Sequence, residues 1–458
     1  MIKYNEIVNY IINEVENKNF KYKQKLPTVR ILSQKFNCSK ATVVRAYDEL
    51  EKEHIVYSIP QSGYYLVENN DELDKNLHTD IINFSSAAPD KGILPYEEFQ
   101  HCLNKAIDMY KQTLFDYSDS KGLPNLISVL KEEFQEYQVF SNEENIFITS
   151  GSQQAINILF NMPFPNGKNN VLVEQPTYNG ALKSLEFSND RVIGIQRNFK
   201  GINLDELERR FANCNIKCFY TIPRFHNPLG TSYSAEEKKQ ILKLAEKYDV
   251  YIIEDDYLAD LEIKSNSYPM YYNDISSRVI YLKSFSKILL PGLRIAAVVL
   301  PKILTNVFKE YKKWADLSTS VLSQGALEIY IKSGMFKAHV KKIRKTYFER
   351  MNLLKRELTQ ANMHYLKCHV PDTGFFACIE LIEKVNVSNI IKELRYSNNI
   401  YLEDVEKNYL KDYFNDNILK ISIARANIEN IKCGIPIILD KISKIKEEKS
   451  FYNDVFNI

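Results

Sequence analysis

The stretch YLKSFSKILLPGLR, residues 281–294, decides how this chain is interpreted. It continues an apolar, strand-like run and places Lys287 among Ser, Phe, Ile and Leu side chains. Burial in such surroundings lowers the pKa of a lysine, so that its neutral amine can attack a carbonyl group and form a Schiff base. A single lysine in a lysine-rich chain is weak support, so the interpretation depends on the residues that accompany Lys287.

Apolar, strand-like runs alternate with helical patterns on both sides of this stretch. The runs cover residues 171–174, 217–222, 250–254, 278–282 and 294–300. Between two of them, Ser234 and Glu237 have the spacing of a capping box that opens a helix. Buried strands separated by helices predict an α/β domain with a mostly parallel sheet. Ligands bind at the carboxyl ends of the strands in such sheets.

Polar and aromatic residues follow several of these runs. Asp255 and Tyr257 end the sequence VYIIEDDY, where an acid can pair with a protonated pyridine nitrogen and a phenol can bond a ring oxygen. Asn227, in IPRFHNPLG, can donate to the same oxygen, and Tyr178 can stack on the ring. Each also has a structural explanation, as a loop acid, a turn residue before Pro228 or a core aromatic residue.

A second group of residues has the features of a phosphate site. Ser150, Gly151 and Ser152 precede an apolar helix, so their backbone N–H groups and the positive end of the helix dipole can hold an anion. Ser284 and Arg294 would complete that site. The alternative is that Ser150–Ser152 is only a helix cap.

In this order and at these intervals, the motifs resemble the fold-type I aminotransferases over residues 81–447. The resemblance implies pyridoxal 5'-phosphate (PLP) as cofactor, bound to Lys287 as an internal aldimine. It implies a large α/β part over about 96–325, a smaller α+β part over about 326–447 and a tail at 448–458. The roles that it implies are Asp255 for the pyridine nitrogen, Asn227 and Tyr257 for the ring oxygen, and Ser150, Gly151, Ser152, Ser284 and Arg294 for the phosphate. Tyr117 matches a tyrosine that reaches the phosphate of the partner subunit, which implies a homodimer.

The first 68 residues have a different pattern. From Asn17 to Tyr47 there are eight Lys or Arg residues and no acid. Apolar spacing predicts one helix over residues 4–15 and a second near Pro27. The second helix is expected to bury Val29, Ile31, Leu32 and Phe36. A third helix begins after Ser39 as N-cap and buries Val43, Ala46, Tyr47 and Leu50. Two strands around residues 60–63 have the size of a wing.

The sequences LPTVRILSQ (26–34), CSKATVVRAYDELE (38–51) and QSG (61–63) resemble the GntR-type winged helix-turn-helix. The resemblance implies contacts to double-stranded operator DNA from Arg30, Lys40, Thr42, Arg45 and Gly63. Many GntR proteins have an arginine where this chain has Val44, so Arg45 is expected to carry more of the affinity. The alternative is a small helical bundle with a solvated basic face.

A GntR-type head before an aminotransferase-like body, joined by a polar linker over residues 69–80, resembles the MocR subfamily of transcriptional regulators. That resemblance implies a cytoplasmic sensor in which an amine or amino-acid effector displaces Lys287 and changes DNA affinity. Net charge is only +2, so DNA binding must depend on a local basic patch. The sequence lacks an export signal and a membrane-spanning run, and its seven scattered cysteines predict reduced thiols rather than a metal site.

The pattern departs from the aminotransferases near the C-terminus. Family members usually have an arginine that grips an α-carboxylate, in a strand reading LRLxF, and here the aligned run is LKISIAR, residues 419–425. Lysine offers a point charge and not a fork. Either Lys420 binds a carboxylate less strictly, or Arg425 takes its place, or the effector is not an ordinary α-amino acid.

Three functions are therefore open. The first is a PLP-dependent regulator that responds to an amine, and the second is a working aminotransferase with an appended DNA-binding domain. The third is a regulator whose effector is PLP itself.

Overall fold

The structure is a computed structural model in which the chain forms two compact units, Met1–Asp80 and Ile81–Ile458. Each unit has its own hydrophobic core. The predicted linker over residues 69–80 and Tyr117 lie outside the described residues. The structure describes residues 3–17, 19–20, 25–52, 55–59, 62–66, 81–116, 118–188, 191–360, 363–382, 386–414 and 417–456.

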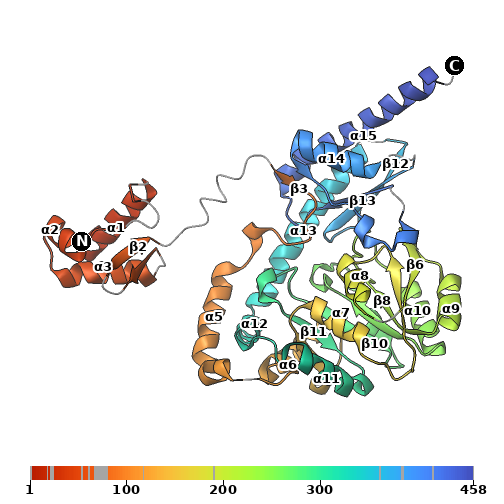
Figure 1. Ribbon diagram of the computed structural model, residues 1–458, viewed down its shortest axis with the longest axis horizontal. Helices are drawn as coiled ribbons and strands as arrows, with labels where there is room; N and C mark the ends of the chain where they lie inside the picture. Colours follow the sequence, from red (N-terminus) through yellow and green to blue (C-terminus); the bar gives the residue numbers. More distant parts are fainter. Residues whose placement is uncertain are drawn as a thin grey trace. The chain divides into compact units, whose positions relative to one another are not determined.

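Helices and a small antiparallel sheet form the N-terminal unit (Figure 1). The elements are α1 (Lys3–Glu16), α2 (Val29–Lys35), α3 (Lys40–Lys52), β1 (Val56–Ile59) and β2 (Gly63–Leu66). Ser39 caps α3, because its hydroxyl accepts a hydrogen bond of 3.2 Å from the Thr42 N–H. The predicted inner face of α3 is fully buried, at Val43, Ala46, Tyr47 and Leu50. Strands β1 and β2 pair as the predicted wing.

The prediction for α2 is wrong at one residue. Leu32 is fully buried and Val29 and Phe36 are half-buried, but Ile31 is 53% exposed. Successive residues of a helix are about 100° apart around its axis, so the side chains of Ile31 and Leu32 point in different directions. Leu32 takes the inner position and Ile31 faces solvent.

An eight-stranded sheet forms the centre of the second unit. Its order is β4-β11-β10-β9-β8-β5-β6-β7. The strands from β10 to β6 are parallel, as predicted, while β11 is antiparallel to both of its neighbours and β7 is antiparallel to β6. The bounds are β4 (Ile146–Thr149), β5 (Asn170–Gln175), β6 (Val192–Asn198), β7 (Gly201–Ile202), β8 (Ile216–Thr221), β9 (Tyr251–Asp255), β10 (Val279–Ser284) and β11 (Ala296–Val299).

Alternation along β9 decides which side of the sheet receives Asp255. Tyr251 and Ile253 belong to the larger core, which includes residues of helix α7 (Ser152–Asn161). Ile252 belongs to a second core, with residues of the helices α9 (Leu204–Asn213) and α10 (Ala235–Lys247). Side chains two residues apart in a strand share a face. Asp255 therefore faces the side of the sheet on which α7 begins.

Helices surround the large sheet and link it to a smaller part (Figure 1). Helix α10 begins with the predicted capping box, formed by Ser234 and Glu237. The helices are α5 (Tyr96–Tyr110), α6 (Pro124–Gln135), α7 (Ser152–Asn161), α8 (Asn179–Glu186), α9 (Leu204–Asn213), α10 (Ala235–Lys247), α11 (Thr305–Asp316), α12 (Val321–Lys332), α13 (Met335–Gln360), α14 (Val387–Asn398) and α15 (Ile428–Phe456).

The smaller part is built on an antiparallel sheet of order β12-β13-β15. Its strands are β12 (Leu366–His369), β13 (Phe376–Leu381) and β15 (Ile418–Ser422). Two short strands, β3 (Ile82–Asn83) and β14 (Ile400–Tyr401), pair in parallel. The first residues of the second unit are therefore joined to the segment that contains residue 400. Among the described residues, no helix has the length and apolar character needed to cross a membrane.

Candidate functional site

Lys287 lies in the turn that follows β10, three residues after the strand ends. Burial, followed by the positive charge of Lys420, lowers the pKa of Lys287 to about 8, against the opposing charges of Asp255 and Glu403. Roughly a tenth of the amine is then neutral at pH 7. Lys287 therefore has the reactivity expected of a lysine that forms a Schiff base.

Asp255, the last residue of β9, is a buried carboxylate with one oxygen unpaired. Its Oδ2 accepts a hydrogen bond of 2.7 Å from the Tyr220 hydroxyl, while its Oδ1 has no hydrogen-bond partner within the described part of the chain. Burial raises the pKa of Asp255 to about 7. A buried acceptor without a donor costs free energy, so this oxygen is suited to a cationic N–H donor from a ligand.

The anion end of the site is formed where α7 begins. Gly151 precedes the helix with a φ of +85°, and a Cβ there would lie 2.5 Å from Nη2 of Arg294. Arg294 Nη2 in turn donates to the Ser150 carbonyl oxygen at 3.4 Å. An exposed guanidinium next to a helix N-terminus is a suitable place for a phosphate group. Glycine is favoured at 151 because a side chain at this φ is strained, and a Cβ there would also force the Arg294 guanidinium to move.

The three predicted serines differ in their surroundings. The Ser150 hydroxyl donates to Asp316 Oδ2 at 2.9 Å, so Asp316 holds it. Ser284 is buried at the end of β10, and its hydroxyl accepts a hydrogen bond of 3.3 Å from the Ser286 N–H. Ser152 is the first residue of α7, so its backbone N–H has no acceptor within the helix.

The predicted ring contacts come from three separate segments. Tyr257 is buried, and its hydroxyl donates to the Phe225 carbonyl oxygen at 2.7 Å. Asn227 accepts a hydrogen bond of 3.3 Å at Oδ1 from Lys420. Tyr178 is half-buried, and burial together with the charge of Asp255 raises its pKa. The structure thus brings Tyr178 near Asp255 and joins Asn227 to Lys420, while the Tyr257 hydroxyl is engaged with the main chain.

Lys420 and Arg425, the two candidates for the carboxylate clamp, are in different environments. Lys420 is 1% exposed in β15 and forms an ion pair of 2.7 Å with Glu403. Arg425 is exposed. Lys420 lies close enough to Lys287 to lower its pKa, so Lys420 is the residue of the pair that the structure brings into the site.

Sequence reasoning missed several residues of this site. The Ser286 hydroxyl is buried without a hydrogen-bond partner among the described residues, one position before Lys287. The serines at 284 and 286 in SFSK were a signal that could have found it. Tyr220, Asp316 and Glu403 come from segments without a motif, and only the fold brings them to the predicted residues.

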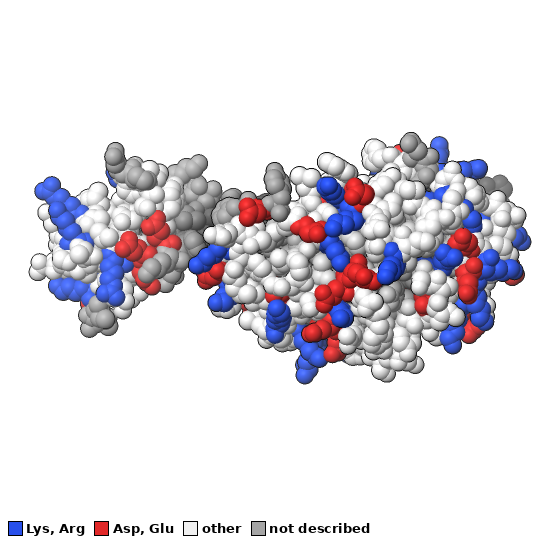
Figure 2. Space-filling view, turned by 90° about the horizontal axis from the view of Figure 1, so that it is seen from below, with Lys and Arg blue, Asp and Glu red and all other residues white. Residues whose placement is uncertain are grey.

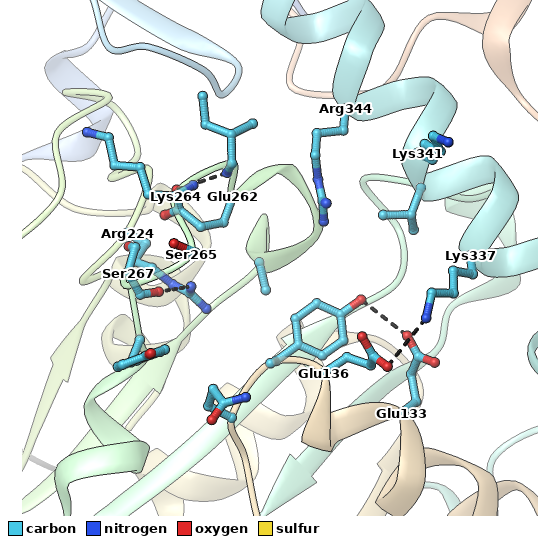
Figure 3. Close-up of a pocket in the computed structure, with 16 residues that line it drawn as sticks. Glu133, Glu136, Arg224, Glu262, Lys264, Ser265, Ser267, Lys337, Lys341 and Arg344 are labelled. Carbon is cyan, nitrogen blue, oxygen red and sulfur yellow. Dashed lines mark hydrogen bonds and ion pairs between the residues drawn. The ribbon is translucent and has the colours of Figure 1, made fainter.

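A separate cavity of about 620 Å³ lies outside this group of residues (Figure 3). It is lined by Lys337, Lys341 and Arg344 of α13 and, opposite them, by Glu133 of α6 and by Glu136, which directly follows that helix. Several of these charges are already paired, since Lys337 lies 3.4 Å from Glu136 and Arg344 Nε donates to the Asp260 carbonyl oxygen at 3.0 Å. The cavity is lined by none of the residues predicted to bind PLP, so it is not the candidate site.

The N-terminal unit presents the predicted DNA-binding residues on α2, α3 and the wing. Arg30, Lys40 and Arg45 are exposed and Thr42 is half-buried. The Arg45 guanidinium lies 4.5 Å from the centre of the Tyr4 ring, and Gly63 has a φ of +129°. On the face drawn in Figure 2, Lys and Arg side chains lie at several places on this unit, and most of the acidic side chains in view lie together.

Tyr47 joins the parts of this unit to one another. Its ring stacks on Tyr64 of the wing at 3.9 Å between ring centres, and its hydroxyl donates to the Pro27 carbonyl oxygen at 2.5 Å. The aromatic pair therefore fixes α3 against both the wing and the segment before α2.

Two family models match the chain, one over each unit. The model for bacterial regulatory proteins of the gntR family matches residues 3–66, and the model for class I and II aminotransferases matches residues 79–435. The chain is 43% identical to a protein of Bacillus subtilis (strain 168) described as the uncharacterized HTH-type transcriptional regulator YcxD, over 96% of this chain and 100% of the relative.

Aminotransferases resemble the second unit alone. The chain is 29% identical to aromatic-amino-acid aminotransferase 1 of Thermococcus litoralis, over 70% of this chain and 79% of that enzyme. The crystal structure of Pyrococcus horikoshii kynurenine aminotransferase in complex with PMP matches with a TM-score of 0.73 at 27% identity, over 83% of this chain and 95% of that one.

Proposed function

This chain belongs to the class I and II aminotransferase family and carries a gntR-family DNA-binding domain, which is the MocR architecture, and we propose that it is a transcriptional regulator controlled at Lys287. It binds a double-stranded DNA operator through the N-terminal unit. The second unit binds PLP and a small amine, and the ligation state of the Lys287 site changes operator affinity.

The observation that carries this proposal is a buried carboxylate with an unpaired oxygen, Asp255, in the same unit as a buried lysine with a lowered pKa, Lys287. Asp255 Oδ1 has no donor within the described ranges of the chain, and the protonated pyridine nitrogen of PLP is a donor of the right charge. Gly151 and Arg294 provide a place for the phosphate group, and Lys287 supplies an amine whose pKa is lowered to about 8. The residues present therefore fit PLP.

When bound, PLP supplies a carbonyl carbon that condenses reversibly with primary amines. The side chains of this chain bind and orient it. Asp255 holds the ring nitrogen, Asn227 and Tyr257 are assigned to the ring oxygen, and Arg294, Ser284 and the residues 150–152 are assigned to the phosphate. Lys287 would hold the cofactor at its carbonyl carbon, and its lowered pKa of about 8 would let its amine accept or release a proton near neutral pH.

Control of DNA binding follows if the ligation states of Lys287 favour different geometries of the protein. A ligand shifts such an equilibrium only by its difference in affinity for the two states, and the coupling is reciprocal.

We also propose that the active species is a homodimer. Two helix-turn-helix units then contact two half-sites of an operator.

A working aminotransferase with an appended DNA-binding domain is the second candidate. It is supported by the same polar groups, because Asp255, Lys287 and Arg294 are residues of the types that a transamination site uses. A third candidate is a regulator whose effector is PLP itself, with no amine required.

One experiment separates the three candidates. The purified full-length protein, with and without PLP, is titrated with primary amines while the visible absorption of the bound cofactor and the affinity for a selected DNA duplex are measured. A change in both readouts without turnover supports the regulator. Steady conversion of an amino acid and a keto acid supports the aminotransferase, and a DNA response to PLP alone supports the third candidate.

A further inference from the structure

Lys420 stands where aminotransferases usually have the carboxylate-binding arginine, but its donors are already used. A lysine ammonium has three N–H groups and no acceptor. Lys420 Nζ lies 2.7 Å from Glu403 Oε2, 3.3 Å from Asn227 Oδ1 and 4.1 Å from the centre of the Phe376 ring. Two of these neighbours accept hydrogen bonds, and the ring covers another side of the ammonium group. A carboxylate on a ligand therefore competes with partners that are already in place.

Glu403 is firmly held as the partner of Lys420. Its Oε1 lies 2.5 Å from Lys407 Nζ, and the backbones of Glu403 and Lys420 are joined in a β-bridge. Burial alone would raise the pKa of Glu403, but Lys420 and Lys407 outweigh it and lower that pKa. Glu403 is thus ionised at neutral pH, and separating it from Lys420 would leave a buried charge without its partner.

The contact between Lys420 and Asn227 sets the orientation of the amide. Because Lys420 can only donate, Asn227 must present Oδ1 to it, and the amide NH₂ group is then directed to other partners. The ring oxygen of the cofactor is the acceptor that the proposed function assigns to that NH₂ group. Lys420 therefore acts on the cofactor through Asn227.

We infer that Lys420 is a positioning residue for Asn227 and that the effector of this site is a primary amine without an α-carboxylate. This inference rests on the proposed function, since it concerns the ligand that replaces Lys287. In that exchange the ligand nitrogen bonds to the cofactor's carbonyl carbon as the bond to the Lys287 nitrogen breaks, Lys287 leaves as a free amine, and no electrons are gained or lost. Arg425, the other candidate for a clamp, is exposed.

The test uses two ligands that differ only by the α-carboxylate, n-butylamine and L-norvaline. The PLP-loaded, full-length protein is titrated with each while the visible absorption is followed, and free PLP is titrated in parallel to correct for intrinsic reactivity. After this correction, n-butylamine is expected to half-saturate the protein at a concentration about tenfold lower, the difference that one charge-assisted hydrogen bond makes. Equal half-saturation, or a preference for L-norvaline, would overturn the inference.

Variants at the ion pair make the test specific. Glu403→Gln frees Lys420, so the preference for n-butylamine should fall by about threefold or more. Lys420→Arg supplies a guanidinium group with additional N–H donors for a carboxylate, so it should also lower the preference for n-butylamine. This variant provides the test if Glu403→Gln does not load PLP. Glu208→Gln is the matched control, because it removes the carboxylate of a 2.7 Å ion pair with Lys247 that involves none of the residues assigned to the cofactor. Its ligand preference should equal that of the wild type.

The outcomes distinguish this inference from the proposed function. A wild-type protein that loads PLP and changes operator affinity with L-norvaline as readily as with n-butylamine contradicts the inference and leaves the regulator standing. A protein whose absorption responds to neither ligand and whose operator affinity is the same with and without PLP contradicts the proposed function itself.

Discussion

The Tyr220 hydroxyl donates a hydrogen bond of 2.7 Å to Asp255 Oδ2 and leaves Oδ1 of the same carboxylate without a partner among the described residues. Asp255 is buried, and its pKa is raised to about 7 by that burial. A carboxylate in this state gains from a cationic donor, because the donor removes the unpaired acceptor and compensates the buried charge.

Asp255→Asn should weaken PLP binding by about tenfold to hundredfold, because the amide cannot compensate the charge of a pyridinium nitrogen. Tyr220→Phe should weaken it by only about two- to fivefold, since it removes one neutral hydrogen bond and keeps the carboxylate. Titration of the cofactor-free protein with PLP, followed by absorption, measures both. An unchanged affinity in Asp255→Asn would remove Asp255 from the cofactor site.

Gly151→Ala should lower PLP affinity and destabilise the protein by about 1–3 kcal/mol, because an alanine at a φ of +85° is strained and its Cβ would meet Arg294. Gly292→Ala is the control, since a Cβ there meets nothing within 4 Å. Denaturant unfolding and PLP titration of the two variants give the comparison. Equal behaviour of the two alanine variants would contradict the proposed role of Gly151 beside Arg294 in binding the phosphate.

The rate at which the cofactor-free protein takes up PLP should rise with pH. Lys287 has a pKa lowered to about 8, and only its neutral form attacks a carbonyl, so the reactive fraction grows through that pH. Between pH 7 and pH 9 this fraction increases about tenfold. Stopped-flow absorption across this range measures the rate. An increase of about hundredfold over this range, as expected for a lysine with an ordinary pKa of about 10.5, would contradict the lowered pKa of Lys287.

The sequence predicts the strands of the large sheet better than it predicts their directions. Buried strands such as β5, β8 and β9 are continuous apolar runs, which can be recognised in the sequence without knowing the neighbouring strands. The direction of β11 is not, because an apolar run reads alike in a parallel and an antiparallel position. The helix α2 shows a similar limit, since apolar residues 31 and 32 were both expected inside and only Leu32 is buried.

Some residues of the candidate site could likewise be predicted from the sequence, and others could not. Lys287, Asp255 and Gly151 could be proposed because each follows a strand or precedes a helix in a motif with fixed spacing. Glu403 could not be proposed, because its pairing with Lys420 depends on a β-bridge between a loop and β15. The departure at Lys420 was visible in the sequence, but the partner that occupies its donors was not.

Arg45→Ala should weaken binding to a selected operator duplex and reduce the slope of log affinity against log salt concentration by about 1, the contribution of one phosphate contact. Its PLP absorption should be unchanged, because Arg45 belongs to the N-terminal unit. Lys243→Ala is a matched control, since it removes one exposed positive charge from α10 in the other unit. Fluorescence anisotropy at several salt concentrations measures both. Equal salt slopes in the two variants would mean that α3 is not the DNA-contacting helix.

Operator affinity as a function of the state of Lys287 is the most direct test of the central claim. The duplex is selected by the protein from a random pool, and its affinity is measured for the wild type and Lys287→Ala, each cofactor-free, PLP-loaded and treated with n-butylamine. We expect the wild-type affinity to change by about fivefold or more between ligation states, whereas Lys287→Ala should bind the duplex with one affinity throughout and lack the absorption of the bound cofactor. A wild-type affinity that is the same in all three states would contradict control of DNA binding through Lys287.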